Sequence, residues 1–134
     1  MLPLSQTSTV SPKTIVIVDD SLDLTRTYQQ VLELEGYRVF LAGNGPEALA
    51  LLSRIPAPDL LLVDCLMPGM SGVDFLRELE KNNQAVFKST PIVGLSGLYR
   101  ESPILKEMGT MVRRLAEKPN DIDEVLKLVR ETVR

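Results

Sequence analysis

The chain has 134 residues, which suits one domain with a single buried core and is too short for two domains with a linker. Its 15 basic and 18 acidic residues give a net charge of -3, so direct binding to nucleic acid or to anionic lipid is not expected. One cysteine and no histidine exclude an internal disulfide, disfavour a structural zinc site and leave no histidine to donate a phosphoryl group.

The chain opens with a segment that does not look like part of the fold. Residues 1–12 are rich in serine, threonine and proline and show no periodicity, which predicts a solvated tail before a domain over residues 13–134. No run of about 18 apolar residues occurs, and the start lacks the pattern of a signal peptide. We therefore expect a cytoplasmic protein without a membrane segment.

Short apolar runs alternate with amphipathic ones through the first half of the chain. The run KTIVIV is β-branched and is followed by two aspartates, as expected for a strand buried on both faces. Gly36 is placed to end the first helix and Pro46 to open the second. The expected elements are a strand over residues 13–18, a helix over 21–35, a strand over 37–42, a helix over 46–54 and a strand over 59–63.

The second half continues the alternation with a weaker segment after the fourth strand. Apolar positions recur at helical spacing after Ser71 and again after Asp121. Two arginines in the fifth apolar run indicate an edge strand. The expected elements are a helix over residues 71–81, a strand over 91–95, a short helix over 101–108, a strand over 112–117 and a helix over 121–133.

Strands that are each followed by a helix predict a particular class of fold. The connections are too long for hairpins, so the strands are expected to run parallel, with right-handed crossovers and helices on both faces. This is a doubly wound α/β fold of the flavodoxin-like type. Ligands in such folds bind beyond the carboxyl ends of the strands.

Polar residues collect at that edge of the predicted sheet. Asp19 and Asp20 follow the first strand, Asp64 the third, Ser96 the fourth and Lys118 the fifth. Three converging carboxylates repel one another unless a cation neutralises them or one is protonated, and Mg²⁺ suits an all-oxygen set. Lys118 adds a charge for a phosphoryl oxygen or for Asp64. We predict a phosphoryl-transfer site.

Each of these residues has an ordinary explanation when it is considered alone. Asp19 and Asp20 could cap a helix. Ser96 could close a turn, and Lys118 could be a solvated lysine. Cys65 follows a buried strand and is expected to be a small apolar filler. The joint occurrence of complementary groups after four separate strands favours the functional interpretation.

Several motifs in order along the chain resemble those of one family. They are IVIVDDS, DCLMPGMSG, PIVGLSG and EKP, and together they are similar to the receiver domain of bacterial two-component response regulators. The resemblance covers the chain from residue 13 to the carboxyl terminus. It implies a phosphorelay protein whose phosphoryl group comes from a histidine kinase or a histidine phosphotransfer protein and whose output is a downstream effector protein or domain.

The resemblance also implies roles for individual residues. Asp64 would be the phosphoryl acceptor. Mg²⁺ would be bound by Asp20, by Asp64 and by the backbone carbonyl of Leu66, and Asp19 would hold a metal-bound water. The phosphoryl oxygens would be received by Lys118, by Ser96 and by the backbone N–H groups of Cys65 and Gly97.

Two further expectations concern switching and backbone geometry. Switching in the family couples movement of a serine or threonine, here Ser96, to rotation of an aromatic residue three positions before the lysine. This chain has Leu115 at that position, so the form of the switch is expected to differ. Leu66, two residues after the acceptor, is expected to affect dephosphorylation. The Lys118–Pro119 peptide is predicted to be cis and to aim the lysine at Asp64.

Other functions remain as alternatives to a phospho-accepting receiver. A receiver-like interaction module that acts without phosphorylation is favoured by Leu115. A phosphatase with an aspartate nucleophile is disfavoured because the chain has no insertion to enclose a substrate. A flavodoxin-like cofactor carrier is disfavoured because acidic residues follow the first strand. We do not expect an enzyme that acts on outside substrates.

Overall fold

The computed structural model describes residues 11–97 and 102–133, so most of the predicted tail lies outside the described residues. A parallel sheet forms the centre of the molecule. Its strands are β1 (Thr14–Val18), β2 (Arg38–Ala42), β3 (Leu60–Asp64), β4 (Ile92–Ser96) and β5 (Arg114–Glu117).

The strands lie side by side in the order β2-β1-β3-β4-β5. All neighbours are parallel, with Ile15 in register with Val39 of β2 and with Leu60 of β3. The chain therefore reverses its direction of winding between β1 and β3, which places the switch point between these two strands. The predicted fold class is confirmed, and β5 is an edge strand as expected.

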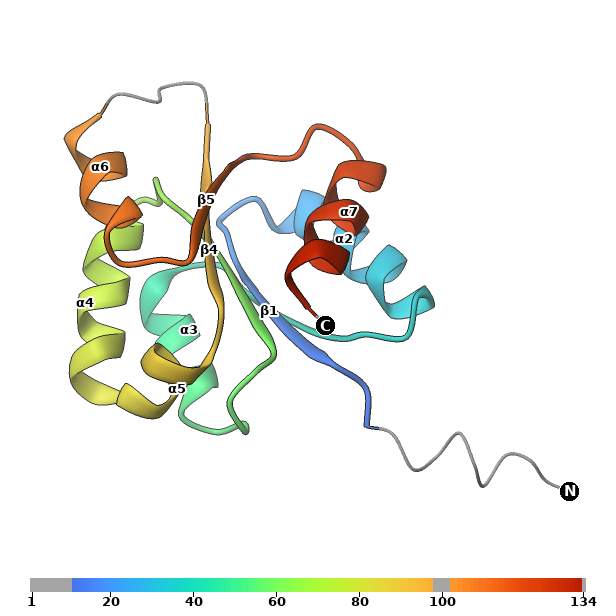
Figure 1. Cartoon of the computed structure of the whole chain (residues 1–134), viewed down its shortest axis with the longest axis horizontal. Helices are drawn as coiled ribbons and strands as arrows, with labels where there is room; N and C mark the ends of the chain where they lie inside the picture. The colour runs from blue at the N-terminus through green and yellow to red at the C-terminus, as the bar shows by residue number, and fades with distance from the viewer. Residues whose placement is uncertain (1–10, 98–101, 134) are drawn as a thin grey trace, which may run out of the picture.

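Alternate residues of the central strands point into two separate cores. Val16 and Val18 face a core shared with the helices α3, α4, α5 and α6. Ile15 and Ile17 face a second core shared with α2 and α7. Figure 1 shows these two groups of helices on opposite sides of the sheet. Strands covered on both faces must be apolar throughout, which explains the continuous hydrophobic runs in the sequence.

The helices follow the predicted positions with small shifts at their ends. Their bounds are α2 (Leu22–Leu34), α3 (Gly45–Leu52), α4 (Gly72–Asn82), α5 (Gln84–Ser89), α6 (Pro103–Gly109) and α7 (Ile122–Thr132). Residue 101, the first of the predicted short helix, is outside the described residues. Within the described ranges, no helix has both the length and the apolar character needed to cross a membrane.

Helix α5 was not predicted from the sequence. Asn83 separates it from α4 and accepts a hydrogen bond from the N–H of Val86 (3.4 Å) as its N-cap. The Asn83 side chain also donates to the carbonyl of Leu52 (3.3 Å). Six residues are too few to show helical periodicity, and the two asparagines at 82 and 83 resemble a loop.

Candidate functional site

Three carboxylates meet at the carboxyl ends of β1 and β3. Because Val18 is in register with Val63, the residues that follow them lie next to each other. Carboxylate oxygens of Asp19, Asp20 and Asp64 lie within 4.8 Å of one another. Asp19 and Asp64 are only 2% and 5% exposed, whereas Asp20 is exposed to solvent. The structure therefore brings these three residues together, as the sequence predicted.

This donor set fits Mg²⁺ on chemical grounds. All the side chains in the cluster offer oxygen atoms, which are the ligands that this ion prefers. The exposure of Asp20 leaves one side of the cluster open to water and to an incoming phosphoryl group. The two buried aspartates carry charges that need compensation, because a buried carboxylate is costly without a partner.

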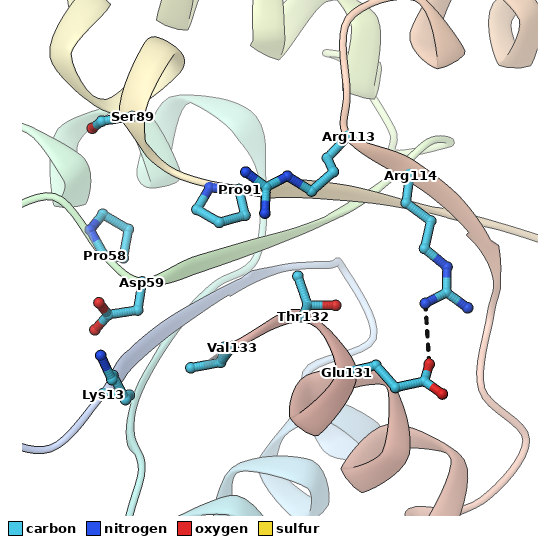
Figure 2. A pocket seen from close by; sticks show the side chains of 10 residues that line it. All are labelled: Lys13, Pro58, Asp59, Ser89, Pro91, Arg113, Arg114, Glu131, Thr132 and Val133. Atoms are coloured by element: carbon cyan, nitrogen blue, oxygen red, sulfur yellow. Dashed lines mark hydrogen bonds and ion pairs between the residues drawn. The ribbon is translucent and has the colours of Figure 1, made fainter.

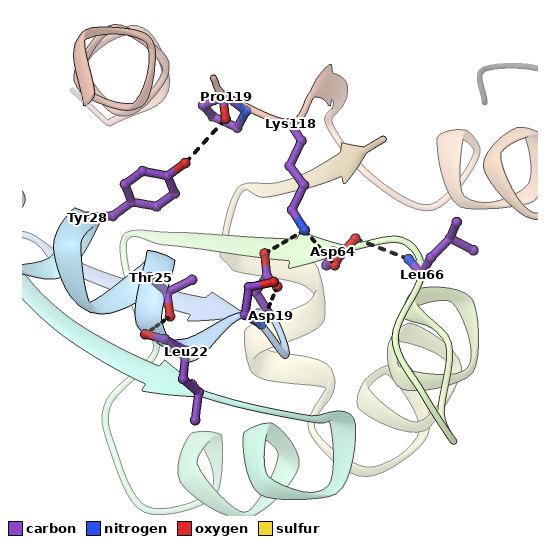
Figure 3. A network of polar contacts seen from close by, with 9 residues as sticks. Asp19, Leu22, Thr25, Tyr28, Asp64, Leu66, Lys118 and Pro119 are labelled. Atoms are coloured by element: carbon purple, nitrogen blue, oxygen red, sulfur yellow. Dashed lines mark hydrogen bonds and ion pairs between the residues drawn. The ribbon is translucent and has the colours of Figure 1, made fainter. Parts of the chain in front are cut away.

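Lys118 provides the compensating cation among the described residues. Its Nζ atom lies 3.0 Å from Oδ2 of Asp64 and 3.1 Å from Oδ2 of Asp19 (Figure 3). The backbone N–H of Lys118 donates to the carbonyl of Ser96 (2.7 Å), which fixes the start of the loop after β5. One ammonium group thus bridges two carboxylates, which keeps both near the position where a metal would bind.

The peptide bond between Lys118 and Pro119 is trans, so the prediction of a cis bond was wrong. The lysine nevertheless reaches Asp64. Its long, flexible side chain carries the ammonium to the carboxylates, and the hydrogen bond to Ser96 holds the backbone. A cis bond is therefore not needed to aim the charge.

Burial and charge change the protonation of the groups at the site. Burial raises the pKa of Asp64, and the hydrogen bond and charge of Lys118 offset this only in part. Burial alone would lower the pKa of Lys118, but its hydrogen bonds and charge interactions with Asp64 and then Asp19 raise it. Burial, with a smaller effect of Asp64, raises the pKa of Cys65 to about 11, so the thiol stays protonated and acts as the expected filler.

The raised pKa of Asp64 leads to a prediction about stability without metal. A carboxyl whose pKa rises on folding binds its proton more tightly in the folded state, so its ionised form reduces stability above the folded pKa. Asp64→Asn should therefore raise the urea midpoint in metal-free buffer near pH 7. This gain should disappear as the pH falls through the raised pKa toward the ordinary value of 3.8. An unchanged gain in acid would contradict this explanation.

Ser96 ends β4 at the same edge of the sheet, and its hydroxyl is bonded to β5. It is buried, and its Oγ donates to the carbonyl of Ala116 on β5 (3.3 Å). Gly97 follows it and has open space where a Cβ would stand. The Ser96 proton is thus engaged with β5, and the phosphoryl contacts expected of Ser96 and Gly97 remain predictions.

The backbone N–H of Cys65, expected to receive a phosphoryl oxygen, already has a hydrogen-bond partner in the structure. The N–H of Cys65 donates to the carbonyl of Leu95 (3.0 Å) within the sheet, so it is not free to receive an oxygen. The N–H of Leu66 instead donates to Oδ1 of Asp64 (3.2 Å). This correction follows from parallel pairing, because β3 continues its hydrogen bonds to β4 one residue beyond Asp64. The Leu66 carbonyl remains a predicted metal ligand.

Gly72 supports the chain at the end of β3, although the sequence did not single it out as functional. Its N–H donates to the carbonyl of Cys65 (3.0 Å). A Cβ at this position would lie 2.8 Å from the carbonyl oxygen of Asp64 and 3.1 Å from the Cα of Cys65. Only glycine permits this close approach of two backbones. The signal that could have found it is the glycine that ends the DCLMPGMSG motif.

A separate hollow of about 620 Å³ lies at the opposite edge of the sheet, near the amino ends of the strands (Figure 2). Three of its charged side chains form contacts within the protein. Asp59 accepts a hydrogen bond from the N–H of Thr14 (2.8 Å), and Arg114 pairs with Glu131 (3.1 Å). These contacts hold the ends of β1 and α7, and the hollow is not part of the carboxylate site.

The fold agrees with comparisons to known proteins. Residues 15–130 match the response regulator receiver domain, and the chain belongs to this family. It is 32% identical over 120 residues to sporulation initiation phosphotransferase F of Bacillus subtilis, covering 87% of this chain and 90% of that protein. It is also 40% identical over 82 residues to the transcriptional regulatory protein CpxR of Klebsiella pneumoniae, covering 61% of this chain but only 32% of that protein.

Solved structures show the same relationship. Chemotaxis protein CheY4 of Vibrio cholerae superposes with a TM-score of 0.77 at 28% identity, covering 91% of this chain and 99% of that one. The chain is thus a regulatory signalling domain of the two-component type. It spans about a third of the CpxR protein that it matches and nine-tenths of the Bacillus phosphotransferase.

Proposed function

We propose that this chain accepts a phosphoryl group on Asp64 from a partner histidine kinase or histidine phosphotransfer protein, in the cytoplasm and with Mg²⁺ bound. The observation that supports this most strongly is the geometry around the acceptor. Asp64 is buried beside Asp19, contacts Lys118 at 3.0 Å and has the exposed Asp20 at its open side.

The transfer places specific demands on these residues. An Asp64 oxygen forms a bond to phosphorus while the bond from phosphorus to the histidine nitrogen of the donor breaks, and the imidazole leaves with the bonding electrons. The Lys118 ammonium, which already contacts this carboxylate, stabilises negative charge on a phosphoryl oxygen. The Leu66 N–H lies close enough to serve as a second donor. Ser96 becomes a third if its hydroxyl rotates.

Mg²⁺ would be held by Asp20 and Asp64 and by the Leu66 carbonyl, with Asp19 orienting a bound water. When bound, it neutralises the carboxylates and the equatorial phosphoryl oxygens. Because Asp19 and Asp64 are buried, the ion would stabilise their charges more strongly than it would in water.

Metal dependence provides the test of this proposal. With acetyl phosphate as donor, the mass of the intact protein should increase by one phosphoryl group in Mg²⁺ and not in EDTA. Asp20→Asn should raise the Mg²⁺ concentration for half-maximal modification by about tenfold, the effect of losing roughly 1.4 kcal/mol from one charged ligand. Asp20 is exposed, so its replacement should leave the stability of the folded protein unchanged.

The matched control is Asp123→Asn, which removes an exposed carboxylate from α7. It should leave the Mg²⁺ dependence unchanged. Modification that proceeds equally well in EDTA, or an Asp20→Asn variant with the metal dependence of the wild type, would contradict the proposal.

An interaction module that works without phosphorylation is the second candidate. Leu115 favours it, because this aliphatic side chain stands where the family uses an aromatic switch and is 38% exposed on β5. Equal affinity of an effector partner for the wild type and for Asp64→Ala would support this second function. Membership of the family supports the class of each partner in this proposal, a histidine kinase or phosphotransfer protein as donor and an effector protein or domain as output.

A further inference from the structure

Tyr28 connects helix α2 to the loop that carries the site lysine. Its side chain is 7% exposed, and its hydroxyl donates to the carbonyl of Pro119 (3.2 Å), the residue directly after Lys118 (Figure 3). Burial, followed by the negative charge of Asp19, raises the pKa of Tyr28. The hydroxyl therefore keeps its proton at neutral pH and remains a hydrogen-bond donor.

The Lys118–Pro119 segment is held at three points by three different parts of the molecule. The Lys118 N–H is bonded to Ser96 at the end of β4. The Lys118 ammonium is bonded to Asp64 and Asp19 at the ends of β3 and β1. The Pro119 carbonyl is bonded to Tyr28 on α2. A change in the position of Lys118 therefore acts directly on Pro119, the next residue in the chain.

Tyr28 is well placed to pass such a change to two helices. It belongs to the core that joins α2 with α7, which includes Leu32 and Val125. Tyr28 lines a small cavity together with Val125 and Leu128 of α7 and with Lys118. An ion pair between Glu35 and Arg130 also joins the two helices. Movement of the tyrosine thus affects the packing of α2 against α7.

The side chain of Leu115 lies on the opposite face of β5 from Tyr28. Leu115 packs its methyl groups toward Gly94 and Gly109, so it offers no hydrogen bond that could change with the state of the site. Ser96 contacts β5 through the backbone carbonyl of Ala116 rather than through a side chain. The hydroxyl of Tyr28 is the side-chain hydrogen bond that links Pro119 to α2, and Glu124 of α7 accepts a second bond from the same loop, from the N–H of Asn120 (2.7 Å).

We infer that Tyr28 is a positioning residue that couples the phosphorylation state of Asp64 to the α2 and α7 surface through the carbonyl of Pro119. This inference rests on the proposed function. In the unmodified protein the ammonium of Lys118 is shared by two carboxylates. A phosphoryl group on Asp64 presents new oxygens to Lys118 and draws it from Asp19, which displaces Pro119 and alters its hydrogen bond to Tyr28.

The test compares Tyr28→Phe with Tyr37→Phe by backbone amide NMR. Beryllofluoride with Mg²⁺ serves as the probe, because it mimics a phosphoryl group on an aspartate. Tyr37 packs against the same core, but its hydroxyl makes no hydrogen bond within the described ranges, so its loss is a matched control. Tyr28→Phe removes one neutral hydrogen bond and should change the affinity for the probe by no more than about fivefold.

The wild type and Tyr37→Phe should show shifts around Asp64 and Lys118 and also along α2 and α7. Tyr28→Phe should keep the shifts around Asp64 and lose most of those along α2 and α7. Shifts along both helices that match the wild type in Tyr28→Phe would overturn the inference and leave the proposed function intact. An absence of any shift in the wild type would instead overturn the proposed function and the coupling with it.

Discussion

Asp64→Asn is expected to abolish phosphoryl uptake from acetyl phosphate in Mg²⁺. The amide is a far weaker nucleophile than the carboxylate and removes one charge from the metal site. It retains nearly the same shape, so the contact with Lys118 and the burial of the position should survive. Intact-mass spectrometry should show no phosphoryl adduct under conditions that modify most of the wild type.

A surviving adduct in this variant would mean that another residue accepts the group. Asp20 and Asp19 are the neighbouring carboxylates, but Asp19 is already bonded to Lys118 and to the N–H of Ser21 (2.9 Å). Asp123→Asn, on the surface of α7, controls for the general effect of removing a carboxylate and should be modified as the wild type is. Modification of Asp64→Asn at the wild-type rate would be incompatible with the proposed acceptor.

Lys118→Met is expected to lower stability in metal-free buffer by about 2–3 kcal/mol, because two buried carboxylates lose their shared cation. This is below the usual effect of breaking a buried ion pair because the lysine side chain is 29% exposed. The pKa of Asp64 is already raised by burial, so acid should protonate it readily and reduce the loss. Urea unfolding at neutral and acidic pH measures both effects.

Mg²⁺ should restore part of the stability of Lys118→Met, since the ion supplies positive charge at the same carboxylates. Phosphoryl uptake should remain much slower than in the wild type, because the ammonium that stabilises the phosphoryl oxygens is gone. Lys127→Met, an exposed lysine of α7, is the matched control and should change neither property. A Lys118→Met variant as stable as this control would show that the lysine does not neutralise the aspartates.

The architecture was predictable because the central strands are buried on both faces. Such strands must be apolar along most of their length, and runs such as residues 60–63 show this directly in the sequence. Helix periodicity located most helices, and Pro and Gly marked several of their ends. The exception, α5, is short and depends on the Asn83 side chain, whose contact with Leu52 is a tertiary feature that local sequence does not reveal.

The site was predictable to the extent that it follows from topology. Parallel strands bring their carboxyl ends to one edge, so Asp19, Asp64 and Lys118 were expected to meet, and they do. Details that depend on hydrogen-bond direction were not predictable. The Cys65 N–H is used by the sheet, and the trans bond before Pro119 still allows the lysine to reach the acceptor.

Tyr28 was missed for a related reason. Its position in α2 fits an ordinary apolar core residue, and the sequence spacing between it and Pro119 gives no indication of contact. Only the packing of α2 beside the loop after β5 brings the hydroxyl to the carbonyl. A contact between segments that lie far apart in the chain, such as α2 and the loop after β5, is visible only in the structure.

Chemical mapping of the modified residue tests the proposed acceptor most directly. Borohydride reduces an aspartyl phosphate to homoserine, so treating the protein after acetyl phosphate and Mg²⁺ marks the acceptor for peptide mass spectrometry. We predict homoserine at position 64 and at no other aspartate. Recovery of unmodified Asp64, or of homoserine at a different position, would contradict the assignment of this buried carboxylate as the phosphoryl acceptor.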